Sequence, residues 1–133
     1  GHTQDSISLL DEEAGYLFAG DFLYPGQLYG FLPNSNMGDY LQGARTIDSV
    51  SGIDLRVFGA HRDDALGVPE LTFETVVQLQ DALEAIQSGA LKSNGLYPVA
   101  YTVSERVQLL SEPKWLQKWK PTYPELNVGK KSD

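Results

Sequence analysis

The stretch Leu17-Phe18-Ala19-Gly20-Asp21 decides how this sequence is interpreted, because an apolar run ends there in a carboxylate. Two other segments place a histidine in a comparable position: Gly1-His2-Thr3, and Val57-Phe58-Gly59-Ala60-His61. Imidazole and carboxylate groups held on rigid elements are the ligands that a divalent metal needs. The sequence therefore nominates His2, Asp21 and His61 as metal ligands.

Each of these residues also has a simpler interpretation. A single histidine at the end of a strand is more often a hydrogen-bonded structural residue than a ligand. A Gly-Asp pair after an apolar strand usually forms a turn, because aspartate accepts local backbone hydrogen bonds and glycine tolerates unusual dihedral angles. The metal hypothesis therefore depends on the three segments taken together and in their order.

In that order, the three segments resemble the C-terminal half of the metallo-β-lactamase superfamily. Gly1 to Ser6 is similar to the superfamily segment G-H-T-x-[DG]-[SNH], whose histidine binds the first zinc. Leu17 to Asp21 is similar to L-F-x-G-D, whose aspartate bridges both metals, and Phe58 to His61 is similar to the late G-x-H, whose histidine binds the second zinc. The stretch from Tyr24 to Tyr40 looks like hydrolases of the superfamily that carry GDFLYPGPLY…LPGSD…Y.

The sequence also departs from the superfamily pattern. The signature H-x-H-x-D-H, which supplies two ligands to each zinc, is absent from this chain. The resemblance therefore implies an incomplete site, with His2 and Asp21 for one zinc ion and Asp21 and His61 for the other. Zinc in proteins usually has three or four protein ligands. We expect the chain to be a fragment that is inactive alone and that pairs with a missing N-terminal half or with a second copy of itself.

Composition fits one ordinary globular unit. The 133 residues are 41% apolar, enough for a core, and we expect a single domain over residues 1–128 with a disordered tail at 129–133. The net charge of −8 argues against nucleic-acid or anionic-membrane partners, which favour a basic surface. No apolar run approaches the length of a membrane span. Cysteine is absent, which excludes disulfides and thiolate zinc sites but leaves the redox compartment undetermined. A cytoplasmic location is the default expectation.

Periodicity predicts alternating strands and helices. We expect strands at 6–11, 16–19 and 55–60, the last of them buried, and a hairpin formed by 96–103 and 106–110. Helices are expected at 37–50, capped by Ser35 or Asn36, and from Thr72 to Ser88, stopped by Gly89. Residues 21–37 are expected to form a long aromatic loop, residues 63–70 a second loop, and residues 115–119 a packed turn.

The resemblance implies an α/β (α+β) fold, the C-terminal half of an αβ/βα sandwich, with one mixed sheet and two main helices on one face. It implies zinc-dependent hydrolysis, with Asp21 as the bridging catalytic residue and His2 and His61 as terminal ligands. A bridging aspartate is typical of the glyoxalase II-like and acyl-thioester branch, so ester or thioester substrates come first and β-lactams second. The alternative from another class is a non-catalytic interaction or assembly module. Among other pairs, Asp63-Asp64 is better explained as a solvated acidic loop than as additional ligands.

Overall fold

The computed structural model describes residues 1–50, 54–62 and 68–123. Its elements follow the chain in this order: β1 (Leu9–Asp11), β2 (Tyr16–Gly20), β3 (Gly26–Gly30), α1 (Met37–Val50), β4 (Arg56–Gly59), β5 (Glu70–Thr72), α2 (Phe73–Ser88), β6 (Val99–Thr102), β7 (Val107–Ser111) and the short 3-10 helix η1 (Lys114–Leu116). The expected tail at 129–133 and the pair Asp63-Asp64 lie outside the described residues.

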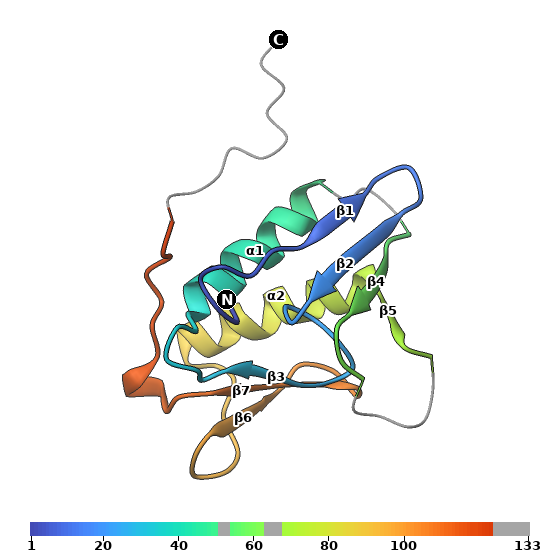
Figure 1. The fold of residues 1–133 in the computed structure, drawn as a ribbon. Helices are drawn as coiled ribbons and strands as arrows, with labels where there is room; N and C mark the ends of the chain where they lie inside the picture. Colours follow the sequence, from blue (N-terminus) through green and yellow to red (C-terminus); the bar gives the residue numbers. More distant parts are fainter. Residues whose placement is uncertain (51–53, 63–67, 124–133) are drawn as a thin grey trace.

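The strands form two mixed sheets (Figure 1). The first has the order β1-β2-β4-β5, with β2 and β4 parallel and the outer pairs antiparallel. The second has the order β3-β7-β6, with β3 and β7 parallel and β6 and β7 antiparallel. The two helices pack against each other behind the four-stranded sheet. The expected fold class with two main helices is confirmed, but the strands divide between two sheets, where one was expected.

The second sheet forms because the expected aromatic loop contains a strand. Within residues 21–37, Gly26–Gly30 is β3, and its exposure alternates from Gln27 to Gly30 as in a strand with one buried face. Pro25 and the flanking glycines conceal this period of two in the sequence. The loop prediction was therefore wrong for these five residues. The loop expected at 63–70 was also wrong at its end, since Glu70 begins β5.

The helix boundaries follow the predicted signals. Between the two expected caps the structure selects Asn36, whose side-chain Oδ1 accepts a hydrogen bond from the Asp39 N–H at 2.9 Å. Thr72 does stand at the N-cap of α2, although its hydroxyl makes no capping bond. Gly89 ends α2 in the left-handed conformation, with φ of 84°, and its N–H bonds back to the last turn.

Two strand predictions need adjustment. β1 is shorter than expected, since residues 6–8 precede it as irregular chain. β4 is not buried throughout. Arg56 is exposed while Val57 is fully buried, as expected of a strand in a sheet that turns one face toward the helices. The predicted hairpin is confirmed as β6 and β7.

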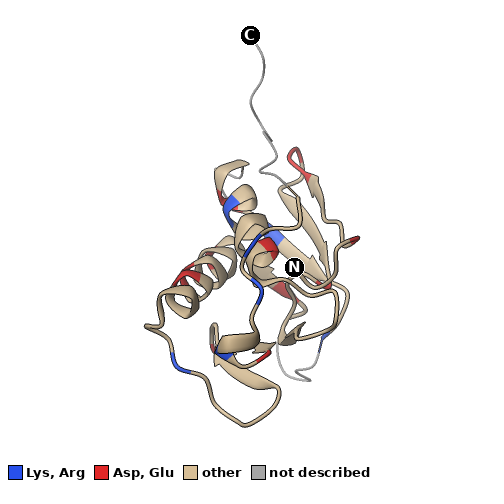
Figure 2. Cartoon of the chain, turned by 90° about the vertical axis from the view of Figure 1, so that its left-hand side faces the viewer, with Lys and Arg blue, Asp and Glu red and all other residues tan. Residues whose placement is uncertain are grey.

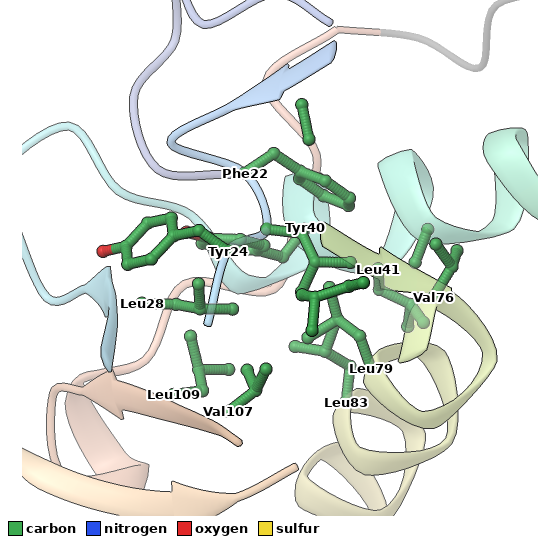
Figure 3. Close-up of a cluster of buried hydrophobic side chains, with 14 of the residues drawn as sticks. Phe22, Tyr24, Leu28, Tyr40, Leu41, Val76, Leu79, Leu83, Val107 and Leu109 are labelled. Carbon is green, nitrogen blue, oxygen red and sulfur yellow. The ribbon is translucent and has the colours of Figure 1, made fainter. Parts of the chain in front are cut away.

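One core connects both sheets to both helices (Figure 3). The four-stranded sheet contributes every second side chain, and each helix contributes one apolar stripe. The three-stranded sheet contributes the face that it turns toward the helices. Its fully covered members include Leu17, Val57, Tyr40, Val76, Leu79, Leu83, Leu28, Val107 and Leu109. Burial of this kind supplies the main stabilisation of the fold, at roughly 25 cal/mol per Å² of apolar surface.

The opposite face of the four-stranded sheet carries a row of apolar and aromatic side chains, with the Arg56 guanidinium over the Tyr16 and Phe58 rings. We call this the outer aromatic face: Leu9, Tyr16, Phe18 and Phe58. Leu9 lies opposite Phe18 in the β1–β2 pair, and Phe18 stacks on Phe58 with ring centroids 5.8 Å apart. Leu9 is 63% exposed and Phe18 46% exposed. Single exposed apolar residues are ordinary, whereas a contiguous exposed group of them is less common on a soluble monomer.

The C-terminal segment packs back onto the start of α1. The carbonyl of Lys118 accepts the N–H of Met37, and the side chain of Asp39 accepts two bonds from Thr122, at 2.7 and 2.6 Å. The expected packed turn at 115–119 is present as η1 and the residues after it, although Trp115 itself is 81% exposed. This segment satisfies backbone donors that a helix N-terminus leaves unpaired.

Charged residues are distributed without a basic cluster on the face shown in Figure 2, where the blue segments stand apart from one another. None of the described helices is long and apolar enough to cross a membrane.

Candidate metal centre

Asp21 and His61 meet because the strands before them are parallel neighbours. β2 ends at Gly20 and β4 ends at Gly59, and these two residues are register partners. The Ala60 N–H bonds the Gly20 carbonyl at 2.8 Å, which extends this pairing to the residue just before His61. The carboxyl ends of parallel strands lie at one edge of a sheet, so the residues that follow them come together. His61 Nε2 lies 2.7 Å from Asp21 Oδ1.

His2 reaches the same carboxylate from an irregular segment. Its Nε2 lies 3.7 Å from Asp21 Oδ2. The segment is held by the α1 N-terminus, where the Asn36 N–H bonds the Gly1 carbonyl at 2.9 Å and the Ser35 hydroxyl bonds the His2 carbonyl at 2.6 Å. The expectation that His2 stands in a strand context was wrong, but the structure does bring all three nominated residues together.

The tautomer of His2 follows from its hydrogen bond. His2 Nδ1 lies 3.0 Å from the carbonyl oxygen of Tyr29, which can only accept, so Nδ1 carries the proton. In the neutral ring, Nε2 then presents its lone pair toward the Asp21 carboxylate. Two acceptors facing each other repel unless a cation or an additional proton lies with them. This pairing is the usual arrangement around metal-binding histidines, whose second nitrogen donates to a carbonyl or carboxylate.

The three side chains do not form a complete ligand set for one ion. Within residues 1–50, 54–62 and 68–123, no group of three or more His, Cys, Asp or Glu side chains is arranged to hold a metal. Each histidine faces a different oxygen of Asp21.

Exposure differs among the three side chains. His2 is 15% exposed, Asp21 36% and His61 58%. The His61 ring packs edge-on against Tyr24, with centroids 5.2 Å apart, and the buried Tyr24 donates its hydroxyl proton to the Gln27 carbonyl at 2.5 Å. Tyr24 is thus a packing residue. The site is open on the His61 side and closed on the His2 side.

Tyr40 closes the site from behind. Its ring stacks on Phe22, the residue after Asp21, with centroids 5.5 Å apart, and a Cβ placed on Gly1 would come within 2.3 Å of the same ring. The Tyr40 hydroxyl is buried and has no hydrogen-bond partner in the structure. Burial raises the pKa of Tyr40, and the charges of Tyr24 and Asp21 raise it further, so the hydroxyl stays protonated.

A separate cavity lies away from the three candidate ligands. A cavity of about 420 Å³ opens between the N-terminal segment and α1, lined by residues that include Thr3, Leu10, Phe22, Gln42 and Ile47. None of His2, Asp21 and His61 lines it. The metal-site geometry therefore lies on an exposed edge, outside this cavity.

Sequence reasoning missed two contributors to the arrangement. The Tyr29 carbonyl, which accepts from His2, comes from β3, the strand hidden in the expected loop. Ser35 was noted only as a possible helix cap, whereas its hydroxyl bonds the His2 backbone. No pattern in the sequence signals either contact, because both join segments about thirty residues apart.

Comparison with known proteins gives a short match. No family model matches the chain, and no solved structure matches it. Over 41 residues, 31% of the chain, it is 46% identical to the acyl-coenzyme A thioesterase MBLAC2 of Gallus gallus. It is 44% identical over the same length to the proteins of that name from Bos taurus and Homo sapiens.

The match covers only a small part of these relatives. The matched segment spans 15% of each of those relatives. This similarity supports a relationship at superfamily level. The chain covers too little of the relatives for their activity to be transferred directly.

Proposed function

We propose that this chain supplies one side of a two-zinc hydrolytic centre of the metallo-β-lactamase type. In this centre His2 and His61 would hold zinc as terminal ligands, and Asp21 would be the carboxylate ligand that the two sites share. The observation that carries the proposal is the placement of two histidine nitrogens on the two oxygens of one carboxylate. The His2 Nε2 lone pair that faces Asp21 adds a physical reason for a cation at this point.

The donor set fits zinc, for which imidazole nitrogen and carboxylate oxygen are ordinary ligands. Zinc supplies Lewis acidity and lowers the pKa of water to near neutrality, which is the chemistry needed for ester hydrolysis at pH 7. The chain's own contribution is to hold three ligands on a sheet edge. Tyr24 supports the His61 ring, and Tyr29 fixes the proton of His2 on Nδ1.

The substrate class that we propose is an ester or thioester of a small molecule. An aspartate at the bridging position is similar to the acyl-thioester branch of the superfamily, and the matched relatives are named acyl-coenzyme A thioesterases. β-Lactam hydrolysis is the second possibility. The open, half-exposed position of His61 leaves room for a substrate beside the centre.

The remaining ligands must come from outside this chain's described set. We propose that the outer aromatic face receives the part that carries them, either an N-terminal half or a second copy of the chain. β2 and β4 bear Phe18 and Phe58 on this face, and the same strands end at Gly20 and Gly59, shortly before Asp21 and His61. A partner covering the face therefore lies next to the open centre.

A non-catalytic binding module is the alternative function, favoured by the exposed aromatic face alone. One experiment separates the two. Zinc content is measured by elemental analysis for the chain alone and for the chain mixed with a polypeptide that carries H-x-H-x-D-H, with thioester and β-lactam turnover followed in both. The proposal expects weak zinc binding and no turnover alone, and stoichiometric zinc with thioester turnover in the mixture. Docking of the two polypeptides without zinc or turnover would favour the module.

The matched control for this experiment is Asp21→Asn. It preserves the shape of the side chain and removes the negative charge that both histidines face. The variant should still dock and should lose zinc. Equal zinc binding by Asp21→Asn and the parent chain would contradict the proposed centre.

A further inference from the structure

One buried hydroxyl contacts both the backbone of His2 and the acceptor of its ring proton. Ser35, 5% exposed, donates to the His2 carbonyl at 2.6 Å and accepts the Leu32 N–H at 3.2 Å. Its oxygen also lies 3.3 Å from the Tyr29 carbonyl, the atom that accepts the His2 ring proton. The backbone of His2 and the acceptor of its side chain are therefore both connected to the same oxygen.

This arrangement matters because His2 lacks the support of a strand. A histidine in a sheet is oriented by the ladder on both sides, whereas residues 1–8 form no ladder in the structure. The orientation of the His2 ring depends on two contacts, one at the His2 carbonyl and one at the Tyr29 carbonyl. Moving either relative to the other would turn the ring or break its Nδ1 bond. Groups that orient a ligand in this way typically change metal affinity by 10–100-fold when they are removed.

We propose that Ser35 is a positioning residue that fixes the ring orientation and the Nδ1–H tautomer of His2, so that the Nε2 lone pair points at the Asp21 side of the centre. This inference rests on the proposed function for its consequence in zinc binding. The tautomer itself is a property of the metal-free chain. Ser35 touches neither metal nor substrate in this account and acts only through His2.

The chain suits a direct test, because it contains only two histidines. Long-range ¹H–¹⁵N NMR of the imidazole rings at mildly alkaline pH reports which nitrogen carries the proton in each. Wild-type His2 should be protonated on Nδ1. Ser35→Ala should shift His2 toward a mixture of tautomers and weaken zinc binding, titrated by the same signals, by about 10-fold. The signals of His61 serve as an internal reference.

Two further variants make the test specific. Ser35→Thr keeps the hydroxyl and should retain the Nδ1–H tautomer. Ser111→Ala removes another buried serine hydroxyl, one that bonds the Glu112 carbonyl, and should leave both histidines unchanged. If Ser35→Ala fails to fold, His2 protonated on Nε2 in the wild type or in Ser35→Thr would still overturn the proposal.

The outcomes distinguish this inference from the proposed function. His2 protonated on Nε2 in the wild type would overturn the positioning role, as would a folded Ser35→Ala chain with unchanged tautomer and zinc affinity. A chain that binds no zinc even in the mixture with the H-x-H-x-D-H polypeptide, but whose His2 tautomer responds to Ser35→Ala, would retain the positioning role and refute the zinc centre.

Discussion

Gly59 is the position where a single methyl group should damage both stability and the metal centre. A Cβ at this residue would lie 2.3 Å from Tyr24 Cβ, 2.5 Å from the Leu23 carbonyl oxygen and 2.9 Å from Tyr24 Cα. These atoms belong to backbone or are fixed to it, and β4 is hydrogen-bonded on both edges, to β2 and β5. The strand therefore has no easy direction in which to move.

Overpacking of this kind usually costs about 1–3 kcal/mol. Because the contacts at Gly59 are with backbone, we expect Gly59→Ala to reach about 3 kcal/mol. With a urea m-value of about 2 kcal/mol/M, that corresponds to a midpoint lower by about 1.5 M. Tyr24 supports the His61 ring, so its displacement should also weaken zinc binding.

The control is Gly43→Ala on α1. There the added Cβ would meet only the edge of the Phe22 ring, at 3.1 Å, and alanine favours a helix by about 1 kcal/mol over glycine. We expect its urea midpoint to stay near that of the wild type. If Gly59→Ala unfolds within about 0.5 kcal/mol of Gly43→Ala, the close approach of β4 to Tyr24 is not real, and the structural basis for the His61 position fails.

Three further outcomes are expected. Tyr40→Phe removes a buried hydroxyl without a partner, so thermal unfolding should show no loss of stability and a gain of up to about 1 kcal/mol; a clear loss would show that the hydroxyl is bonded. Asp39→Ala removes both bonds from Thr122 and should cost about 1–2 kcal/mol, with faster proteolysis of the C-terminal segment; resistance equal to the wild type would contradict this packing. Light scattering should show self-association of the chain that Phe18→Lys abolishes, and a wild-type monomer at micromolar concentration would refute coverage of the outer aromatic face by a second copy of the chain.

The sequence was sufficient for those parts of the fold that obey local rules. α1 and α2 have regular apolar stripes and recognisable ends, so both could be predicted to within a residue or two. The placement of Asp21 beside His61 could also be anticipated, since both residues follow apolar strand patterns. The parallel pairing of β2 and β4 then brings the two strand ends together.

The remainder depends on contacts between distant segments. β3 has weak strand character and is stabilised by pairing with β7, about 80 residues later, which no local pattern announces. The second sheet was missed for that reason. His2 has no strand of its own, and its position follows from Ser35, Asn36 and Tyr29. Long-range anchoring of this kind is invisible until the chain is folded.

Completion of the centre and coverage of the outer aromatic face are best treated as one event. β2 presents Phe18 outward and ends at Gly20, immediately before Asp21; β4 presents Phe58 and ends at Gly59, two residues before His61. Covering Phe18, which is 46% exposed, would contribute about 1 kcal/mol, because full burial of such a side chain contributes about 1.5–3 kcal/mol, and the partly buried Phe58 would add to this. Adding a histidine or carboxylate to a two-ligand ion satisfies its preference for three or four. A partner that both covers the aromatic side chains and supplies zinc ligands binds in a zinc-dependent manner. A partner that only covers the aromatic side chains binds equally well when zinc is chelated. The zinc dependence of assembly therefore reports whether this sheet edge belongs to an enzyme or to a binding surface.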